Sequence, residues 1–348
     1  MTALRIIFMG TAELSCASLG KLAADKNFSV PAVVTQPDKP KGRDLKLQPS
    51  PVKSLAIKLQ LPVLQPARAR DEQLIAGLRE LKPDLTVVVA YGQILPPGIL
   101  DLPRFGCLNV HTSLLPKYRG AAPIQWAIAN GDVETGVTIM KMDAGLDTGP
   151  MVSQRRTAIL PADDSVTLHD RLAQLGAELL VQTIPDFVAG KIQPVPQPAE
   201  GGCYAAKIKK EDGHIDWNLP AETIRNRLRA FTPWPGAFTF WLGVPPSGGS
   251  PIRTGGPPEG GTPSVLRPSL LKIWKVEVVE QSGGAACRAE ASERRPGEIL
   301  SADKTGIVVG CGHNALRVLE LQREGGRRLS AGEFLAGHAL KVDEKFLV

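Results

Sequence analysis

Hydrophobic and polar positions follow two different patterns along the first half of the chain. Short apolar runs rich in β-branched residues alternate with segments in which apolar residues recur every three or four positions. The runs typical of strands are 4–9, 30–35, 85–90, 106–110, 136–142 and 151–157, and the helix-like segments are 13–24, 50–60, 71–81, 123–129 and 165–187. This alternation predicts an α/β fold, a Rossmann-like parallel sheet with crossover helices.

Two of these segments carry more detail. Residues 87–89 are consecutive valines, as expected for a central strand that is covered on both faces. Segment 165–187 places leucines at 168, 172, 175 and 179, which form one stripe of a helix and should pack on the sheet.

The pattern changes beyond residue 206, where short strand candidates are separated by turns. They are 237–242, 270–279, 297–300, 306–309 and 315–321, a series typical of a small β-barrel. Residues 243–268 are mostly Gly, Pro, Ser and Thr and should form a loop between two barrel strands. The proline-rich stretch before residue 206 resembles a linker, so we expect domains at 1–190 and 207–348 joined by a linker at 191–206.

Composition narrows the class of protein. The 348 residues are 43% hydrophobic, and no apolar run approaches the roughly 20 residues that a membrane span needs. Lys and Arg total 41 against 35 acidic residues, an excess that favours phosphate-rich partners without proving them. The five cysteines are scattered without a CxxC pair, which predicts free thiols. The chain begins with a strand-like run instead of a targeting segment, so we expect a cytoplasmic protein.

The usual nucleotide motifs are missing from the sequence. There is no GxxxxGK[ST] segment, and Gly10 is the only glycine directly after the first strand, so GxGxxG fails. GxSxG and HExxH are also absent. These absences disfavour a dinucleotide dehydrogenase, a P-loop enzyme, an α/β-hydrolase and a zinc protease.

The densest polar cluster is segment 109–120, where a predicted parallel strand ends. Asn109 and His111 are two positions apart on an extended segment, so both side chains project to the same side. Ligands bind at the carboxyl ends of such strands, and an amide and an imidazole there can stabilise an oxyanion and move a proton. Alternatively, both side chains satisfy backbone groups of the adjoining loop.

A second cluster, segment 143–150, is a turn-rich loop with two carboxylates, Asp143 and Asp147. A carboxylate beside an imidazole orients it for acid–base work, although Asp residues in turns also hydrogen-bond the local backbone. A third segment, 35–46, carries four basic residues and could grip a phosphate backbone, or could simply be a solvated loop.

Together these stretches resemble the formyltransferase family that uses 10-formyltetrahydrofolate, and within it the branch whose acceptor is methionyl-tRNA. The matching segments are 6–11, 35–43, 48–53, 87–96, 109–128, 134–151, 215–217 and 229–239. The sequence departs from the family pattern at Ala12 and Leu14, which replace Pro and Phe, and in segments 243–268 and 281–295, which are longer than the usual strand connections.

The resemblance implies a role for each matching residue. The catalytic trio would be Asn109, His111 and Asp147. The folate-contacting segment would be Ser113, Leu114, Leu115 and Pro116. The tRNA-binding residues of the basic loop would be Arg43, Lys39, Lys41 and Lys46.

The implied activity is transfer of the formyl group of 10-formyltetrahydrofolate to the α-amino group of initiator methionyl-tRNA for translation initiation. The implied protein needs no metal, is a monomer, does not bind membranes, and carries an OB-like C-terminal domain that binds tRNA. Three alternatives remain at this point: a sugar-nucleotide formyltransferase, a formyltetrahydrofolate hydrolase, and a non-enzymatic RNA-binding protein.

Overall fold

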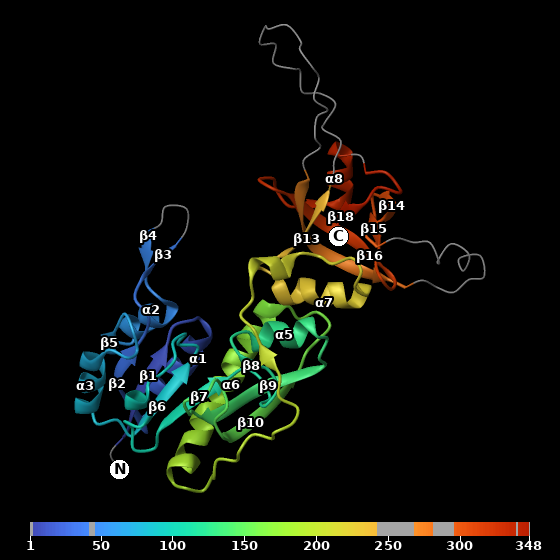
Figure 1. Ribbon diagram of the computed structural model, residues 1–348. Helices are drawn as coiled ribbons and strands as arrows, with labels where there is room; N and C mark the ends of the chain where they lie inside the picture. Colours follow the sequence, from blue (N-terminus) through green and yellow to red (C-terminus); the bar gives the residue numbers. More distant parts are fainter. Residues whose placement is uncertain (1–2, 42–45, 242–267, 281–295, 339, 348) are drawn as a thin grey trace. The chain divides into compact units, whose positions relative to one another are not determined.

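A computed structural model describes residues 3–41, 46–241, 268–280, 296–338 and 340–347 (Figure 1). The chain divides into two compact units. The N-terminal unit comprises Met1–Ala127 and Asp132–Lys207, and the C-terminal unit comprises Ile128–Gly131 and Ile208–Val348. Arg43 and the segments 243–267 and 281–295 lie outside the described residues.

The N-terminal unit contains a seven-stranded sheet in the order β10-β9-β7-β6-β1-β2-β5. The strands are β1 (Leu4–Gly10), β2 (Phe28–Val34), β5 (Val63–Leu64), β6 (Leu85–Val89), β7 (Cys107–His111), β9 (Glu134–Lys141) and β10 (Met151–Ala158). The five strands from β7 to β5 are parallel, which confirms the expected Rossmann-like fold.

The last two strands of this sheet depart from the parallel arrangement. β9 runs antiparallel to β7, with His111 opposite Thr138, and β10 runs antiparallel to β9. The connection between these strands, which includes α5 (Pro123–Ala129), re-enters the sheet at the edge where β7 ends, so β9 runs back against β7. Its length would equally suit a parallel crossover, so the apolar pattern does not decide the direction.

Five further helices belong to this unit: α1 (Leu14–Ala24), α2 (Pro51–Lys58), α3 (Glu72–Glu80), α4 (Pro97–Leu100) and α6 (Ser165–Val188). The Ser50 hydroxyl accepts a hydrogen bond from the Lys53 N–H and Pro51 occupies the first turn, so α2 starts where the sequence predicts. The predicted leucine stripe of α6 is buried at Leu168, Leu172 and Leu179 and half-buried at Leu175.

The C-terminal unit is an antiparallel sheet in the order β14-β15-β16-β13-β12-β18, with β17 paired to β16. Its elements are α7 (Ala221–Phe231), β12 (Ala237–Trp241), β13 (Ser269–Val279), β14 (Ile299–Asp303), β15 (Gly306–Gly310), β16 (Ala315–Arg323), β17 (Leu329–Ser330), α8 (Ala331–Gly337) and β18 (Phe346–Leu347). β12 and β13 stay in register up to the pair Trp241 and Ser269, which flanks segment 242–268.

Backbone hydrogen bonds join the two edge strands of this sheet. The Phe346 N–H donates to the Gly297 carbonyl at 2.9 Å, and the Ile299 N–H donates to the Glu344 carbonyl at 2.8 Å. Gly297 has a φ of +84°, and a Cβ there would lie 2.6 Å from the Phe346 carbonyl oxygen. The sheet therefore curls until its edges meet around a core that includes Trp217, in agreement with the expected OB-like barrel.

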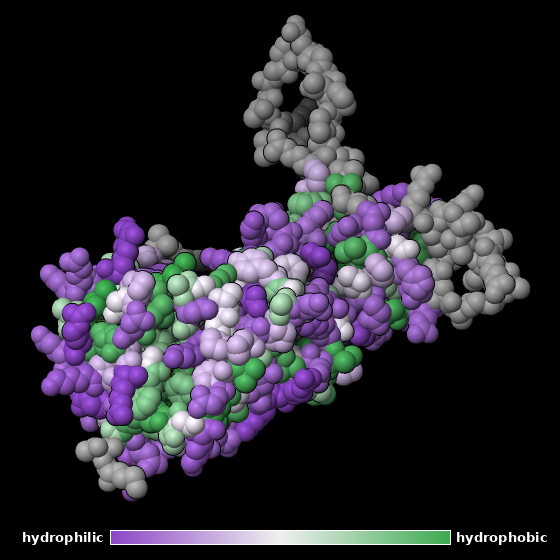
Figure 2. All heavy atoms as spheres, turned by 60° about the horizontal axis from the view of Figure 1, so that its bottom comes forward, coloured by the Kyte–Doolittle hydropathy of each residue, from purple (hydrophilic) through white to green (hydrophobic). Residues whose placement is uncertain are grey.

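Hydrophilic and hydrophobic residues are interspersed over the face that Figure 2 shows. Among the described helices, none is both long and apolar enough to cross a membrane. Cys16, Cys107, Cys203 and Cys311 are free thiols, whereas Cys287 falls outside the described residues.

Candidate active site

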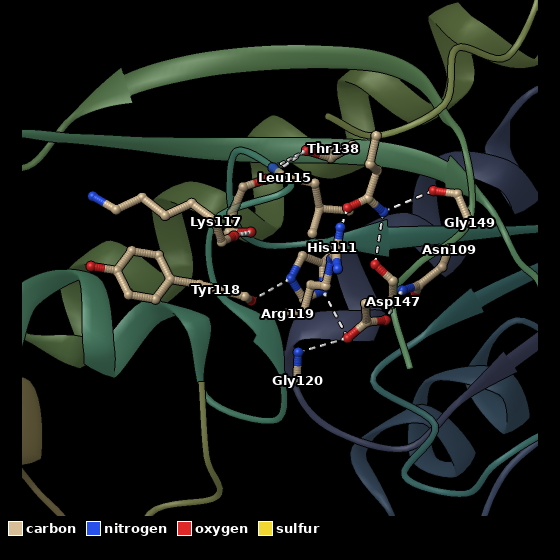
Figure 3. Close-up of polar contacts among 12 residues, drawn as sticks. Asn109, His111, Leu115, Lys117, Tyr118, Arg119, Gly120, Thr138, Asp147 and Gly149 are labelled. Atoms are coloured by element: carbon tan, nitrogen blue, oxygen red, sulfur yellow. Dashed lines mark hydrogen bonds and ion pairs between the residues drawn. The ribbon is translucent and has the colours of Figure 1, made fainter. Parts of the chain in front are cut away.

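β7 brings Asn109 and His111 to the carboxyl edge of the sheet with both side chains on one side, as the alternation of a strand requires (Figure 3). His111 is 5% exposed and Asn109 is half-buried. Both side chains meet the same third residue, Asp147, which comes from the loop between β9 and β10.

The Asp147 carboxylate lies at the centre of this cluster. One oxygen, Oδ1, accepts a hydrogen bond from Asn109 Nδ2 at 3.4 Å. The other, Oδ2, accepts from the Gly120 N–H at 2.9 Å and lies 3.7 Å from His111 Nδ1. The structure thus brings together the three residues that the sequence predicts as a trio.

Asp143 has a different role. Its carboxylate accepts hydrogen bonds from the Gly145 N–H at 3.0 Å and from the Thr148 hydroxyl at 2.9 Å, and the residue is exposed. The turn-forming alternative considered for the two carboxylates therefore describes Asp143 and not Asp147.

The hydrogen bonds of His111 determine which ring nitrogen is able to exchange a proton. Nε2 lies 2.9 Å from the Tyr118 carbonyl oxygen. A carbonyl only accepts, so Nε2 must carry a proton and donate it to Tyr118. Nδ1 is then the nitrogen left to exchange a proton, and it faces the Asp147 carboxylate (Figure 3).

Gly120 shapes the opposite wall of the cluster. It lies in β8 (Arg119–Gly120), which pairs in parallel with β11 (Tyr204–Ala205). Its φ is +113°, and a Cβ there would lie 2.8 Å from the Ala205 carbonyl oxygen and closer still to the Tyr204 ring. Only glycine fits this close approach, which aims its N–H at Asp147.

Hydrogen bonds from Thr138 and Gln154 hold the backbone of the expected folate segment, residues 113–116. The Thr138 hydroxyl donates to the Ser113 carbonyl at 2.7 Å and accepts from the Leu115 N–H at 3.1 Å. Gln154 Nε2 donates to the Leu115 carbonyl at 2.9 Å. Ser113 and Leu115 are buried, so Leu114 and Pro116 are the members of the segment that reach the surface.

Several residues of the site carry no sequence signal that marks them. Thr138 and Gln154 lie in ordinary strands, and Gln197 lies in the stretch expected to be a linker. The stretch belongs to the N-terminal unit, where Gln197 Nε2 donates to the Asp147 carbonyl at 2.7 Å. Only their position opposite β7 or the 143–150 loop identifies them.

The expected basic loop is a hairpin of β3 (Lys39–Lys41) and β4 (Lys46–Gln48). Lys39 and Lys46 are exposed. Arg43 is outside the described residues. At the base of the hairpin, Lys53 Nζ lies 2.7 Å from Asp38 Oδ2, and its hydrogen bond, with a second from Gln65, lowers the pKa of Asp38. The negative charge of Asp38 is thus paired with Lys53 and does not offset the positive charges of Lys39 and Lys46.

Two further groups near the site have shifted titrations. Burial lowers the pKa of Lys117, but its 2.7 Å hydrogen bond to Asp132 and the charge interactions with Tyr118, Asp132 and Cys203 together more than offset this, so the pKa lies above its ordinary value. Burial raises the pKa of Tyr91, whose hydroxyl has no hydrogen-bond partner among the described residues. Within the described part of the chain, no group of three or more His, Cys, Asp or Glu side chains is arranged to hold a metal.

Two family profiles together match most of the chain. The formyl transferase profile matches residues 4–184, and the profile of the formyl transferase C-terminal domain matches residues 207–339. The chain belongs to the formyl transferase family.

Similar formyl transferases extend over nearly the whole chain. A protein of Geobacter sulfurreducens named methionyl-tRNA formyltransferase is 46% identical over 341 residues, which cover 98% of this chain and 96% of the relative. A protein of the same name from Caldanaerobacter subterraneus subsp. tengcongensis is 47% identical and covers 96% of this chain and 97% of its own length.

Solved structures share the fold at lower identity. The N-formyltransferase from Helicobacter canadensis, in complex with folinic acid and dTDP-3-aminofucose, matches with a TM-score of 0.61 and 18% identity over 90% of this chain and 99% of its own. HypX from Aquifex aeolicus matches with a TM-score of 0.58 and 18% identity over 100% of this chain and 51% of that protein. At this identity the likeness concerns the formyl transferase fold alone.

Proposed function

We propose that this formyl transferase transfers the formyl group of 10-formyltetrahydrofolate to the α-amino group of initiator methionyl-tRNA, producing N-formylmethionyl-tRNA for translation initiation. The observation that carries the proposal is the convergence of Asn109, His111 and Asp147 at one point of the sheet edge. Full-length relatives that bear the name methionyl-tRNA formyltransferase support the choice of acceptor.

The trio can perform the two tasks that acyl transfer to an amine requires. When the amine attacks the formyl carbon, negative charge develops on the formyl oxygen and needs hydrogen-bond donors, which Asn109 Nδ2 and a protonated His111 Nδ1 can supply. The amine must lose a proton, which Asp147 can help to relay because its carboxylate lies 3.7 Å from His111 Nδ1. Since Nε2 is held by the Tyr118 carbonyl, the proton must pass through Nδ1.

The donor, 10-formyltetrahydrofolate, supplies the formyl group at N10. We propose that Ser113, Leu114, Leu115 and Pro116 line its binding surface. Thr138 and Gln154 fix the backbone of this segment, so Leu114 and Pro116 can face a ligand without rearrangement. Ile94, in the loop after β6, is 84% exposed and offers a further apolar surface at the same sheet edge. These features suit a partly apolar heterocycle.

Two features suit a tRNA acceptor. Lys39 and Lys46 project from the β3–β4 hairpin, and Lys41 and Arg43 belong to the same basic stretch. The C-terminal unit is a small barrel, an architecture used widely to bind nucleic acids. We propose that the N-terminal unit carries the transfer chemistry and that the C-terminal unit adds tRNA contacts, in a monomeric cytoplasmic enzyme that uses no metal.

The alternatives explain fewer of these features. A formyltetrahydrofolate hydrolase needs neither the basic hairpin nor the barrel. A sugar-nucleotide formyltransferase would share the trio, but the Helicobacter canadensis N-formyltransferase solved with dTDP-3-aminofucose is only 18% identical to this chain, compared with 46–47% for the two relatives named for methionyl-tRNA. A non-enzymatic RNA-binding protein would leave the assembled trio without a purpose.

An acceptor competition tests the proposal. Purified protein is supplied with 10-formyltetrahydrofolate carrying a labelled formyl group and with initiator methionyl-tRNA, elongator methionyl-tRNA and an amino-sugar nucleotide together. We expect label on the initiator tRNA, with little on the other acceptors and little free formate. Predominant free formate would indicate a hydrolase, and label on the sugar would indicate the other transferase branch.

The basic hairpin gives a second prediction. Lys46→Gln and Arg43→Leu should each weaken tRNA binding and lower the slope of log Kd against log salt by about one, the change expected when one phosphate contact is lost. The rate of formylation of a small amine should be unchanged. Lys26→Gln, in the turn before β2 at the opposite edge of the sheet, removes the same charge as a control. A salt slope that is equal in all four proteins would contradict a phosphate contact.

A further inference from the structure

The chain after α6 returns to the catalytic site of its own unit. Residue Val195 exchanges two backbone hydrogen bonds of 2.8 Å with Met151, at the start of β10. Further along, the Cys203 carbonyl accepts from the Arg119 N–H at 2.9 Å, and Ala205 pairs with Gly120. We call residues 195–205 the strap, because the segment is fixed to the site at both of its ends.

Gln197, within the strap, holds the turn that carries Asp147. Its Nε2 donates to the Asp147 carbonyl at 2.7 Å and to the Gly149 carbonyl at 2.8 Å. Its Oε1 accepts from Arg119 Nε at 2.9 Å. All of these bonds lie within the N-terminal unit, and Figure 3 shows Arg119 and Gly149 beside the trio.

The turn needs such a restraint. Asp147 has a φ of +52°, a left-handed conformation that residues with a side chain rarely adopt. Its neighbours from Asp143 to Leu146, and Thr148, are exposed, so side-chain packing contributes little to holding the turn in place. Two hydrogen bonds to carbonyls on either side of Thr148 fix the backbone from which the Asp147 carboxylate projects.

Arg119 determines which way the Gln197 amide points. A guanidinium only donates hydrogen bonds, so the amide oxygen must face Arg119. The NH₂ group is then directed at the turn, where both of its protons find carbonyl acceptors. Arg119 is itself the neighbour of Gly120, whose N–H binds the Asp147 carboxylate.

We propose that Gln197 is a positioning residue for formyl transfer. Oriented by Arg119, it keeps the Asp147 carboxylate aligned with His111 and Asn109 without touching the substrates. This inference rests on the proposed function, because its readout is the transfer reaction. It assigns the strap a part in catalysis beyond connecting the two units of the chain.

The test is Gln197→Glu, which keeps the size of the side chain and the interaction with Arg119 but replaces both donors with an acceptor. We expect kcat for formylation of methionyl-tRNA to fall about 10- to 100-fold, the usual effect of losing a supporting hydrogen bond behind an active group. The KM values for the donor and for tRNA should stay within about threefold, because no substrate contact is removed.

Gln193→Glu is the matched control. Gln193 lies in the same stretch, but its amide donates to the Gly190 carbonyl and not to the site. This variant should keep the wild-type kcat. Gln197→Leu removes the same donors without adding a charge and should show a similar loss of kcat, so the proposal stays testable even if the Glu variant folds poorly.

A double-mutant cycle separates positioning from general stabilisation. If Gln197 acts through Asp147, Gln197→Glu should lower the residual activity of Asp147→Asn by less than about twofold. A full 10- to 100-fold loss in that background, or a wild-type kcat for both Gln197 variants, would overturn the positioning role. A wild-type protein that formylates no tRNA would instead overturn the proposed function.

Discussion

Replacing His111 by alanine is expected to lower kcat for formyl transfer by about 100- to 10,000-fold. The substitution removes both a hydrogen-bond donor and the proton-carrying nitrogen, since Nδ1 faces Asp147 and Nε2 is already committed to the Tyr118 carbonyl. Rapid-quench measurement of a single turnover on bound methionyl-tRNA gives the rate of the chemical step. The Kd for tRNA should change little, because His111 is buried in β7 and does not belong to the basic β3–β4 hairpin.

Two further variants make the result on His111 specific. His111→Gln retains an amide that can donate to the Tyr118 carbonyl but cannot exchange a proton, so it should fold like the wild type and remain slow. His169→Ala removes a histidine of α6 whose ring contacts Asp170, and it should keep full activity. Near-normal turnover of both His111 variants would refute the assignment of this residue.

The substitution Asp147→Asn should lower kcat by about 100- to 1000-fold, with a loss of stability of about one hydrogen bond. The amide has the same shape but no charge, so it cannot form an ion pair with a protonated His111. It also meets donors on every side, because the Gly120 N–H and Asn109 Nδ2 both point at the present carboxylate. The measurement is again the single-turnover rate, together with the midpoint of thermal unfolding.

Asp143→Asn is the matched control for this prediction. It makes the same chemical change in the same loop, but Asp143 accepts its hydrogen bonds from Gly145 and Thr148. Its kcat should stay within about threefold of the wild type. If Asp143→Asn were as slow as Asp147→Asn, the shape of the loop and not the charge of Asp147 would control the rate.

Two local rules single out Asn109 and His111 in the sequence, whereas Asp147 joins them only through the resemblance to the formyltransferase family. Alternation along β7 places Asn109 and His111 on one side, and the carboxyl edge of a parallel sheet is where ligands bind. Residue spacing alone leaves Asp143 and Asp147 equivalent, and the structure distinguishes the two carboxylates by their hydrogen-bond partners.

Features that depend on contacts distant in sequence were not predicted. Gln197 meets Asp147 across 50 positions, and Thr138 meets Ser113 across 25. Neither contact leaves a periodic pattern. The antiparallel direction of β9 was missed for a related reason, because direction depends on where a connection ends in space and not on the apolar pattern of the strand. The closure of the barrel by residues 343–346 is equally non-local.

The register of β12 and β13 has a consequence for how this protein can change over time. Their pairing persists to Trp241 and Ser269, so the two ends of the 27-residue segment between them are held side by side by the barrel itself. Doubling the length of a connection with fixed ends costs only about 0.6 kcal/mol of chain entropy. Codons can therefore be gained or lost at this corner with little penalty, which makes it a natural place to insert a peptide tag or a spectroscopic label.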